Sequence, residues 1–268
     1  MTEARGTSHL TRRVLEVDHL FLALGHETFE ADGARFVRDR DFPGIHDANH
    51  VAHVTADTPE AVERLIARAD REFAHCQHRL FLVDALTPPA VEAVLLLRGY
   101  ERSDFLFLVL EGALTGAASP HDVRALEDEA GWAEYGRLKQ RDWDEVALRL
   151  GLLDVAWVGA DMVRVHRRKS PPVRYWLAYV DGEPRGFVAS LVDAHGTGQV
   201  EDLYVEPDVR HRGLATALIH RAVADCRARG AGPVLIVADG SDTPKRMYAA
   251  MGFRPTAVEH KYLLKLGR

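Results

Sequence analysis

The sequence is poor in cysteine and has no long apolar run. Its only cysteines, Cys76 and Cys226, are too few for a disulfide framework or a thiolate metal cluster. The longest apolar run, 105–110, is far shorter than the ~20 residues of a membrane-spanning helix. The opening Met-Thr-Glu-Ala-Arg-Gly lacks the basic-then-apolar pattern of a signal peptide. We therefore expect a cytoplasmic protein with no membrane partner.

The sequence also lacks an excess of positive charge. The formal net charge is −6 and the pI is about 6.2, so we expect no nucleic-acid partner. Hydrophobic residues make up 47% and charged residues 28%, which is the balance of a globular protein. A length of 268 residues suits two domains, and both a monomer and a homodimer fit these properties.

A stretch of small, uncharged residues divides the chain. Gly112 to Pro120 reads Gly-Ala-Leu-Thr-Gly-Ala-Ala-Ser-Pro, a composition typical of a linker. We place the boundary near residue 118, which gives two domains, 1–118 and 119–268.

The second domain shows an alternation of helices and strands. Apolar residues recur every four positions from Leu214 to Cys226, which predicts an amphipathic helix. Thr243 followed by Pro244 predicts the start of another helix. The remaining expected elements are helices over 132–150 and 154–167, and strands over 174–180, 185–192, 199–205, 233–238 and 258–266.

The first domain repeats the later part of this order. It has an expected helix from Pro59, a strand over 79–83, a helix over 89–97 and a strand over 103–110. The helix starts at Pro59 and Leu214 are 155 residues apart, and Gly99 and Gly252 are 153 apart. A nearly constant offset indicates an internal duplication.

The segment from Val205 to Ala215 carries the main chemical signal. It reads Val-Glu-Pro-Asp-Val-Arg-His-Arg-Gly-Leu-Ala, so a strand leads through a basic loop directly into the amphipathic helix. Loop amides and a helix N-terminus together favour an anion, and Gly213 permits close approach of a ligand. Arg210 and Arg212 can bind phosphate oxygens. The alternative is a basic strand-to-helix turn without a ligand.

Three motifs together resemble the GCN5-related N-acetyltransferase (GNAT) family over about residues 122–266. They are the Val-x-Pro before the loop, the Arg-x-x-Gly-x-Ala within it, and the Tyr248–Phe253 segment that starts 35 residues after Gly213. The resemblance implies an α/β (α+β) fold of tandem GNAT-like domains, as in mycothiol synthases. Each domain would be a mixed, mostly antiparallel twisted sheet flanked by helices. It implies acetyl-CoA or another short acyl-CoA as co-substrate, and no metal.

The resemblance also implies which residues bind acetyl-CoA. In the family, the strand backbone at Leu203, Tyr204 and Val205 pairs with the pantetheine arm and polarises the acyl carbonyl. Ser241 stands where the family often has an Asn that contacts the cofactor arm, and a serine hydroxyl can substitute. The pyrophosphate contacts fall on the loop and the first turn of the helix, at Arg210, His211, Arg212, Gly213, Leu214, Ala215 and Thr216.

Tyr248 lies where the family has its general acid. When an amine attacks the thioester, the departing thiolate needs a proton, and a phenol aimed at the sulfur supplies it. The alternative is an aromatic core residue beside Met247 and Met251.

Glu201 and Asp202 form an acidic pair in the strand before the loop. The family's polyamine acetyltransferases carry a similar pair, whose Glu helps to deprotonate the acceptor ammonium. Strand alternation sends the two side chains to opposite faces, so only one can point at the thioester. We assign Glu201 as the base; the alternative is a solvated carboxylate at the sheet edge.

The histidines of the segment 46–53 suggest a metal site at first sight. If this segment is a strand, His46 and His50 lie roughly 13 Å apart at ~3.3 Å per residue, too far to share one ion. We therefore expect no metal there.

The first domain lacks the residues of the predicted site. Thr55 to Pro59, which aligns with the basic loop, has neither glycine nor arginine, and Leu95 stands in the place of Tyr248. We interpret residues 1–118 as a degenerate GNAT-like copy that braces the catalytic domain and can supply part of the acceptor pocket.

These observations predict an N-acetyltransferase that joins a short acyl group to a primary amine by direct attack in a ternary complex. No cysteine is placed for a covalent acyl-enzyme. We expect a small-molecule acceptor, with a protein or peptide amine as the alternative. A non-catalytic acyl-CoA-binding scaffold or sensor is the rival class, and Tyr248 and Glu201 argue against it because a binder needs neither.

Overall fold

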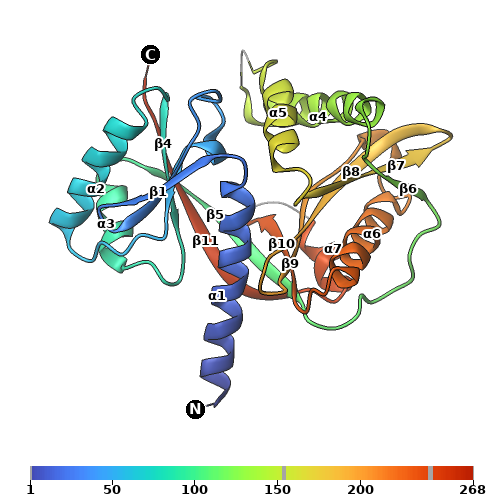
Figure 1. The fold of residues 1–268 in the computed structure, drawn as a ribbon, viewed down its shortest axis with the longest axis horizontal. Helices are drawn as coiled ribbons and strands as arrows, with labels where there is room; N and C mark the ends of the chain where they lie inside the picture. The colour runs from blue at the N-terminus through green and yellow to red at the C-terminus, as the bar shows by residue number, and fades with distance from the viewer. Residues whose placement is uncertain (1, 153–154, 241–243, 268) are drawn as a thin grey trace. The chain divides into compact units, whose positions relative to one another are not determined.

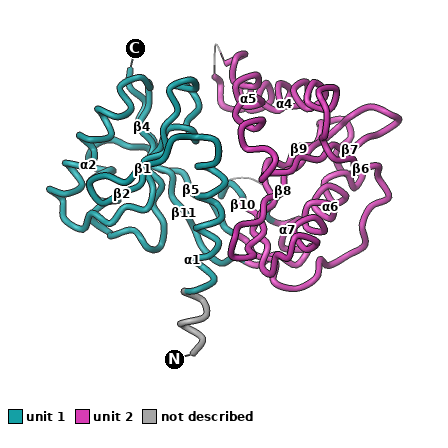
Figure 2. The backbone as a smooth tube through the Cα atoms, in the orientation of Figure 1, with its two compact units in different colours: residues 1–107, 238–245, 255–268 teal, residues 108–237, 246–254 magenta. Residues whose placement is uncertain are grey.

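The computed structural model describes residues 2–152, 155–240 and 244–267 (Figure 1). The chain forms two compact units, which Figure 2 shows in different colours. Unit 1 comprises residues 1–107, 238–245 and 255–268, and unit 2 comprises 108–237 and 246–254. Strands that cross a boundary are described with the unit that holds most of their residues. Thr243, the expected cap of the second helix, lies outside the described residues.

Unit 1 is a mixed sheet covered by helices. Its strands run in the order β1-β2-β3-β4-β11-β5, with β3 parallel to β4 and antiparallel pairing in β1–β2, β2–β3 and β4–β11. The elements are α1 (Thr2–Ala23), β1 (Glu27–Ala31), β2 (Ala34–Arg38), the 3₁₀ helix η1 (His46–Ala48), β3 (His50–Ala52), α2 (Pro59–Glu72), β4 (His78–Val83), α3 (Pro89–Leu97), β5 (Glu101–Leu110) and β11 (Arg254–Lys265).

The core of unit 1 lies where α2 and α3 pack on the sheet. Val62, Leu65 and Ala69 are fully buried and recur at three- and four-residue spacing, so one face of α2 supplies the contact. Phe81 of β4 and Tyr262 of β11 belong to the same cluster. The C-terminal strand is therefore part of the core of the first unit.

Unit 2 is also built on strands of a mixed sheet, in the order β10-β9-β8-β7-β6. Strands β9 and β10 are parallel, and the other neighbours are antiparallel. In Figure 1, α4 and α5 lie on one side of this sheet and α6 on the other. The elements are β6 (Asp122–Ala125), α4 (Glu129–Leu150), α5 (Val158–Lys169), β7 (Arg174–Val180), β8 (Glu183–Val192), β9 (Gly198–Val205), η2 (Pro207–Val209), α6 (Leu214–Ala228), β10 (Val234–Asp239) and α7 (Lys245–Ala250).

Local sequence explains how unit 2 forms. Asp181 and Gly182 both have positive φ, as a two-residue hairpin turn between β7 and β8 requires. Gly198 lets α6 approach β9 closely, since a Cβ there would lie 2.9 Å from the Cβ of Cys226. Cys226 is fully buried, so it packs against the sheet.

The small-residue stretch at 112–120 is part of unit 2 and is held within it by backbone contacts. The Arg227 guanidinium of α6 donates to the carbonyls of Leu110, Glu111 and Gly112. The amide of Thr115 donates to the carbonyl of Met251 at 2.9 Å. Contacts thus divide the chain at residues 107–108, whereas the sequence suggests a linker near residue 118.

The fold class expected from the sequence is confirmed, because in each unit the strand pairing is mixed, mostly antiparallel and flanked by helices. Strand β11 pairs with β4 from His260–Val83 to Lys265–His78, inside the sheet of unit 1. The described part of the chain contains no helix that is both long and apolar enough to cross a membrane.

Candidate active site

The turn between β9 and α6 begins the helix with a glycine. Gly213 is the N-cap of α6, has φ +89° and makes no side-chain capping hydrogen bond. A Cβ at this position would lie only 2.6 Å from Ser119 Oγ. Glycine is therefore required both by the backbone conformation and by the close approach of the 112–120 stretch.

Backbone amides at this turn are available to a ligand. Within the described loop, the amides of His211, Arg212 and Gly213 donate no backbone hydrogen bond. His211 also has positive φ, +62°, so the backbone turns into the left-handed region twice. The first amides of a helix have no partner inside the helix. The result is a concave row of N–H donors at a helix N-terminus, which suits a phosphate group.

The two predicted phosphate-binding arginines differ in their surroundings. Arg210 forms a bidentate ion pair with Glu145 of α4, at 2.9 and 2.7 Å, and its Nε donates to the carbonyl of Val205. The Arg212 side chain is exposed, and the Arg212 carbonyl accepts a 2.7 Å hydrogen bond from His121. Arg212 is thus free of the ion pair that holds Arg210 in place.

A pocket of about 370 Å³ opens beside this ion pair. It is lined by side chains of both charges, and the arginines pair with its carboxylates. Arg141 and Arg185 both contact Glu206, which is buried. The lining residues are Arg141, Asp144, Glu145, Arg185, Tyr204, Glu206, Pro207 and Asp208.

Strand β9 is paired on both sides only along its first half. It pairs with β10 from Gly198–Val234 to Val200–Ile236. Among the described residues, Glu201 to Val205 pair on the β8 side alone. The other edge of this segment, which includes Leu203, Tyr204 and Val205, faces away from β8. An extended ligand can add to such an edge by main-chain hydrogen bonds.

A β-bulge interrupts β9 at the acidic pair. Glu201 pairs with Ala189 and Tyr204 with Phe187, so Asp202 and Leu203 together oppose a single residue of β8. Asp202 has φ +57°. The bulge interrupts the regular alternation from which opposite faces were expected for Glu201 and Asp202, so that expectation stays a prediction.

Asp202 is held in a buried network of polar side chains. Its carboxylate accepts hydrogen bonds from Tyr135 and Lys139 of α4, both at 2.5 Å, and lies 3.5 Å from His166 of α5. Burial raises the pKa of Asp202, but Lys139, His166 and the Tyr135 hydrogen bond together lower it to about 2. Asp202 is thus a fixed anion and a poor base at neutral pH.

Glu201 lies half-buried beside this network. Gln199 donates to its Oε1 at 2.9 Å, and the Asp202 amide donates to Oε2 at 3.3 Å. The carboxylate therefore stays close to its own strand, at the point where the β10 pairing ends. Its role as a base remains a prediction.

Tyr248 lies on α7 and is buried, with 5% of its surface exposed. Its ring centroid is 6.3 Å from that of Phe253, and both residues belong to unit 2. This burial fits a packed aromatic as well as a positioned acid, so the catalytic role remains a prediction. Ser241 lies outside the described residues.

Sequence reasoning missed the partners of Asp202. Tyr135 and Lys139 are four residues apart and so share one face of α4. The sequence did offer a signal, because helical spacing puts Lys139 on the same face as the apolar residues Trp132 and Leu138. In the structure Lys139 is only 4% exposed. A buried lysine requires a carboxylate partner.

The corresponding turn of unit 1 is closed. Thr58 caps α2, since its Oγ accepts a 3.2 Å hydrogen bond from the Ala61 amide. Leu95 of α3 is fully buried in the core of unit 1. At the start of α6, Gly213 has no side chain to cap the first amides of the helix. At the start of α2, the Thr58 side chain accepts a hydrogen bond from a first-turn amide.

The histidines of the segment 46–53 take separate partners. His46 lies in η1 and its ring is 4.2 Å from that of His78, whereas His50 opens β3 and contacts the Asp47 carbonyl. His53 contacts His19 at 2.8 Å. The segment 46–53 is therefore not one continuous strand, as the sequence argument assumed, because residues 46–48 form the 3₁₀ helix η1.

Comparison with known proteins places the segment around this turn in a family. Residues 126–253 match the acetyltransferase (GNAT) family. A mycothiol acetyltransferase from Beutenbergia cavernae is 36% identical over 95 residues, which cover 34% of this chain and 32% of that protein. The chain spans less than half the length of the curated relatives that it matches.

Two solved structures share the fold over most of the chain. A GCN5-related N-acetyltransferase from Kribbella flavida has a TM-score of 0.63 and 16% identity, with 97% of this chain and 94% of that chain covered. A tandem GNAT protein from the clavulanic acid biosynthesis pathway has a TM-score of 0.56 and 13% identity, with 82% and 76% covered. These likenesses show a tandem GNAT fold.

Proposed function

Because residues 126–253 of this chain belong to the acetyltransferase (GNAT) family, we propose that the protein transfers an acetyl or other short acyl group from coenzyme A to a primary amine. The start of α6 carries this proposal. There, Gly213 leaves backbone amides open at the end of β9, and the adjoining strand edge has no partner beyond Val200 in the described chain.

The residues at this turn fit acetyl-CoA. The amides from His211 to Thr216 bind the pyrophosphate, and the exposed Arg212 adds a charged hydrogen bond. A side chain at Gly213 would clash with Ser119 and shift the turn that carries these amides. The free edge at Leu203 to Val205 binds the extended pantetheine arm. Arg210 supports the loop through Glu145 and reaches phosphate only if that ion pair opens.

Two side chains move protons in the proposed reaction. Glu201 accepts a proton from the acceptor ammonium, so that the neutral amine attacks the thioester carbonyl. As the carbon–sulfur bond breaks, Tyr248 donates its proton to the departing thiolate.

Direct transfer in a ternary complex is supported by the state of the cysteines. Both thiols are buried, and burial raises the pKa of Cys76 and of Cys226 to about 12. Since the thiolate is the nucleophile, neither cysteine suits a covalent acyl-enzyme.

The acceptor is proposed to be a small-molecule amine, in a cytoplasmic protein that is a monomer or homodimer without nucleic-acid or membrane partners. The name of the Beutenbergia relative supports a small acceptor. Residues 119–268 are proposed as the catalytic domain. Residues 1–118 are proposed as the degenerate copy, supported by the Thr58 cap and the buried Leu95.

A screen of primary amines with acetyl-CoA, read out by release of free thiol, tests this function. The panel contains polyamines, aminoglycosides, amino sugars and lysine peptides. We expect thiol release that depends on one amine class and disappears with heat-denatured protein. Tight acetyl-CoA binding without amine-dependent thiol release across the panel would instead support the non-catalytic scaffold.

A further inference from the structure

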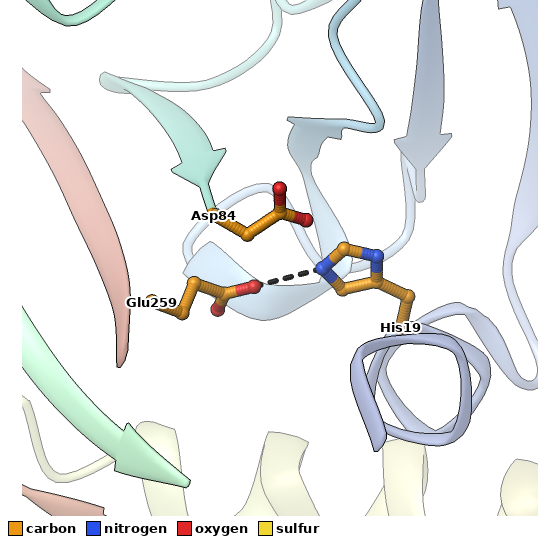
Figure 3. Close-up of side chains that lie close together, drawn as sticks. All are labelled: His19, Asp84 and Glu259. Carbon is orange, nitrogen blue, oxygen red and sulfur yellow. Dashed lines mark hydrogen bonds and ion pairs between the residues drawn. The ribbon is translucent and has the colours of Figure 1, made fainter. Parts of the chain in front are cut away.

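Three metal-binding side chains meet inside unit 1, apart from the turn described above. They are His19 of α1, Asp84 at the end of β4 and Glu259 of β11, and one possible ligand atom from each lies within 4.8 Å of the others. Figure 3 shows the imidazole and both carboxylates pointing toward one another. His19 Nε2 lies 2.8 Å from Glu259 Oε2.

The group is buried and rich in negative charge. His19 is 3% exposed and Glu259 1%, while Asp84 is half-buried. Asp18 is a further buried carboxylate close enough to act on His19. Burying carboxylates is costly unless cations neutralise them, so a bound cation would offset part of this charge. Lys261 adds positive charge nearby, but its ammonium is paired with Asp47 at 2.9 Å.

The side chains are held in place before any ion binds. Asp84 Oδ1 accepts hydrogen bonds from the Leu86 amide at 2.7 Å and from the Thr87 hydroxyl at 3.1 Å. His53 Nε2 lies 2.8 Å from His19 Nδ1 and 3.2 Å from a guanidinium nitrogen of Arg35. Because Arg35 can only donate, His53 Nε2 is an acceptor, and the proton between the rings belongs to His19 Nδ1.

This arrangement leaves His19 Nε2 directed at the carboxylates. Histidines that bind metals usually donate their other ring N–H to an acceptor, which fixes the ring and its tautomer. Here His53 is that acceptor. The ligand atom and the orienting partner of His19 are therefore both present.

We propose that His19, Asp84 and Glu259 bind one divalent transition-metal ion, with Zn²⁺ as the best fit. One imidazole and two carboxylates favour a transition metal over Mg²⁺ or Ca²⁺, which take oxygen ligands. Three protein ligands with a fourth position for water is a common zinc arrangement, at ~2.0–2.2 Å per ligand. On binding, the ion would displace the proton shared by His19 Nε2 and Glu259 Oε2, and the carboxylate oxygens would move to that distance.

The ion would join three segments that are remote in sequence. Glu259 lies 240 residues from His19 along the chain. A metal that closes so long a loop fixes β11 in the sheet of unit 1. The proposed role is structural, and it is independent of the proposed acetyl transfer.

Titration of the chelator-treated full-length chain with Zn²⁺, and separately with Co²⁺, tests the site. We expect one equivalent in calorimetry, a visible Co²⁺ absorption band from a protein-bound ion, and a higher melting temperature with Zn²⁺. His19→Gln and Glu259→Gln should each weaken binding at least ~10-fold. His53→Ala, which removes only the orienting partner, should weaken it ~10- to 100-fold.

His26→Gln is the matched control. His26 also pairs with a carboxylate in unit 1, Asp39 at 2.8 Å, but lies outside the three-residue group. The His26→Gln variant should bind Zn²⁺ with the same affinity as the wild type. If His19→Gln does not fold, Asp84→Asn and Glu259→Gln replace it. The proposal would be overturned if the wild type bound no single equivalent of Zn²⁺. It would also be overturned if the ligand variants matched the wild type in Zn²⁺ affinity and in the shift of melting temperature.

Discussion

Lys139 Nζ on α4 lies 2.5 Å from Asp202 Oδ1 at the bulge of β9. Asp202→Asn removes the charge and leaves the buried lysine with Asp142 alone. Breaking a buried ion pair costs 3–5 kcal/mol in general, and the remaining partner favours the lower end. We expect a loss of about 3 kcal/mol in the free energy of unfolding, measured with denaturant.

Glu201→Gln is the control for this variant, since the half-buried Glu201 makes no ion pair with Lys139. Its free energy of unfolding should change by less than about 1 kcal/mol. Equal losses in the two variants would contradict the importance of the Lys139 pair.

The same pair predicts a dependence of stability on acid. The pKa of Asp202 is about 2 in the folded chain, below its ordinary value of 3.8. The ionised Asp202 therefore contributes fully to the free energy of unfolding above pH 4. About 2 kcal/mol of this contribution is lost as the pH falls toward 2. The stability difference between the wild type and Asp202→Asn should shrink over this interval in denaturant titrations. A difference that stays constant from pH 5 to pH 2 would refute the assignment.

Tyr248→Phe separates catalysis from packing. The variant keeps the buried ring and removes the hydroxyl, so acetyl-CoA affinity should hardly change. Turnover should fall by ~10²- to 10⁴-fold if the phenol is the acid. The lower end is expected because a thiolate is a good leaving group and water can replace the phenol in part. Retained turnover with a lower melting temperature would identify Tyr248 as a core residue.

Arg212→Ala tests the proposed phosphate contact. Arg212 is exposed, so its loss should leave folding intact. Acetyl-CoA affinity should fall ~10-fold, about 1.4 kcal/mol, in calorimetry. Arg64→Ala, at an exposed arginine of α2, is the control and should bind like the wild type. Gly213→Val should weaken binding at least ~10-fold as well, but φ +89° makes any side chain there strained, so its fold must be checked by circular dichroism.

Binding stoichiometry tests the difference between the two units. The open Gly213 turn and the Thr58-capped turn predict one acetyl-CoA per chain. Calorimetric titration should use the whole chain, because a fragment of residues 1–118 lacks β11, the partner of β4. Two equivalents per chain would overturn the interpretation of unit 1 as degenerate.

Features set by neighbouring residues were predictable from the sequence. The strand over 174–180, the helix over 89–97 and the buried face of α6 all match their local patterns. Each depends on the spacing of apolar residues within one segment. The turn before α6 was found for the same reason.

Features that depend on remote pairing were not predictable. The apolar pattern over 258–266 predicts a strand but does not say which strand pairs with it. The pairing of β11 with β4 could therefore not be inferred. The bulge at Asp202 needs the register of β8, which periodicity does not contain. Helix α1 and strands β1 to β3 were missed as well, although Val14, Val17 and Phe21 of α1 follow helical spacing and are buried.

The position of β11 has a consequence for how the protein is made. A ribosome delivers β4 and β5 long before β11, and all the strands of unit 2 emerge in between. During that time the sheet of unit 1 lacks an interior strand, and β4 presents an unpaired edge. Unit 1 therefore finishes folding last although its synthesis starts first. An incomplete sheet with an unpaired edge is the kind of surface that favours exchange of β11 between two copies of the chain.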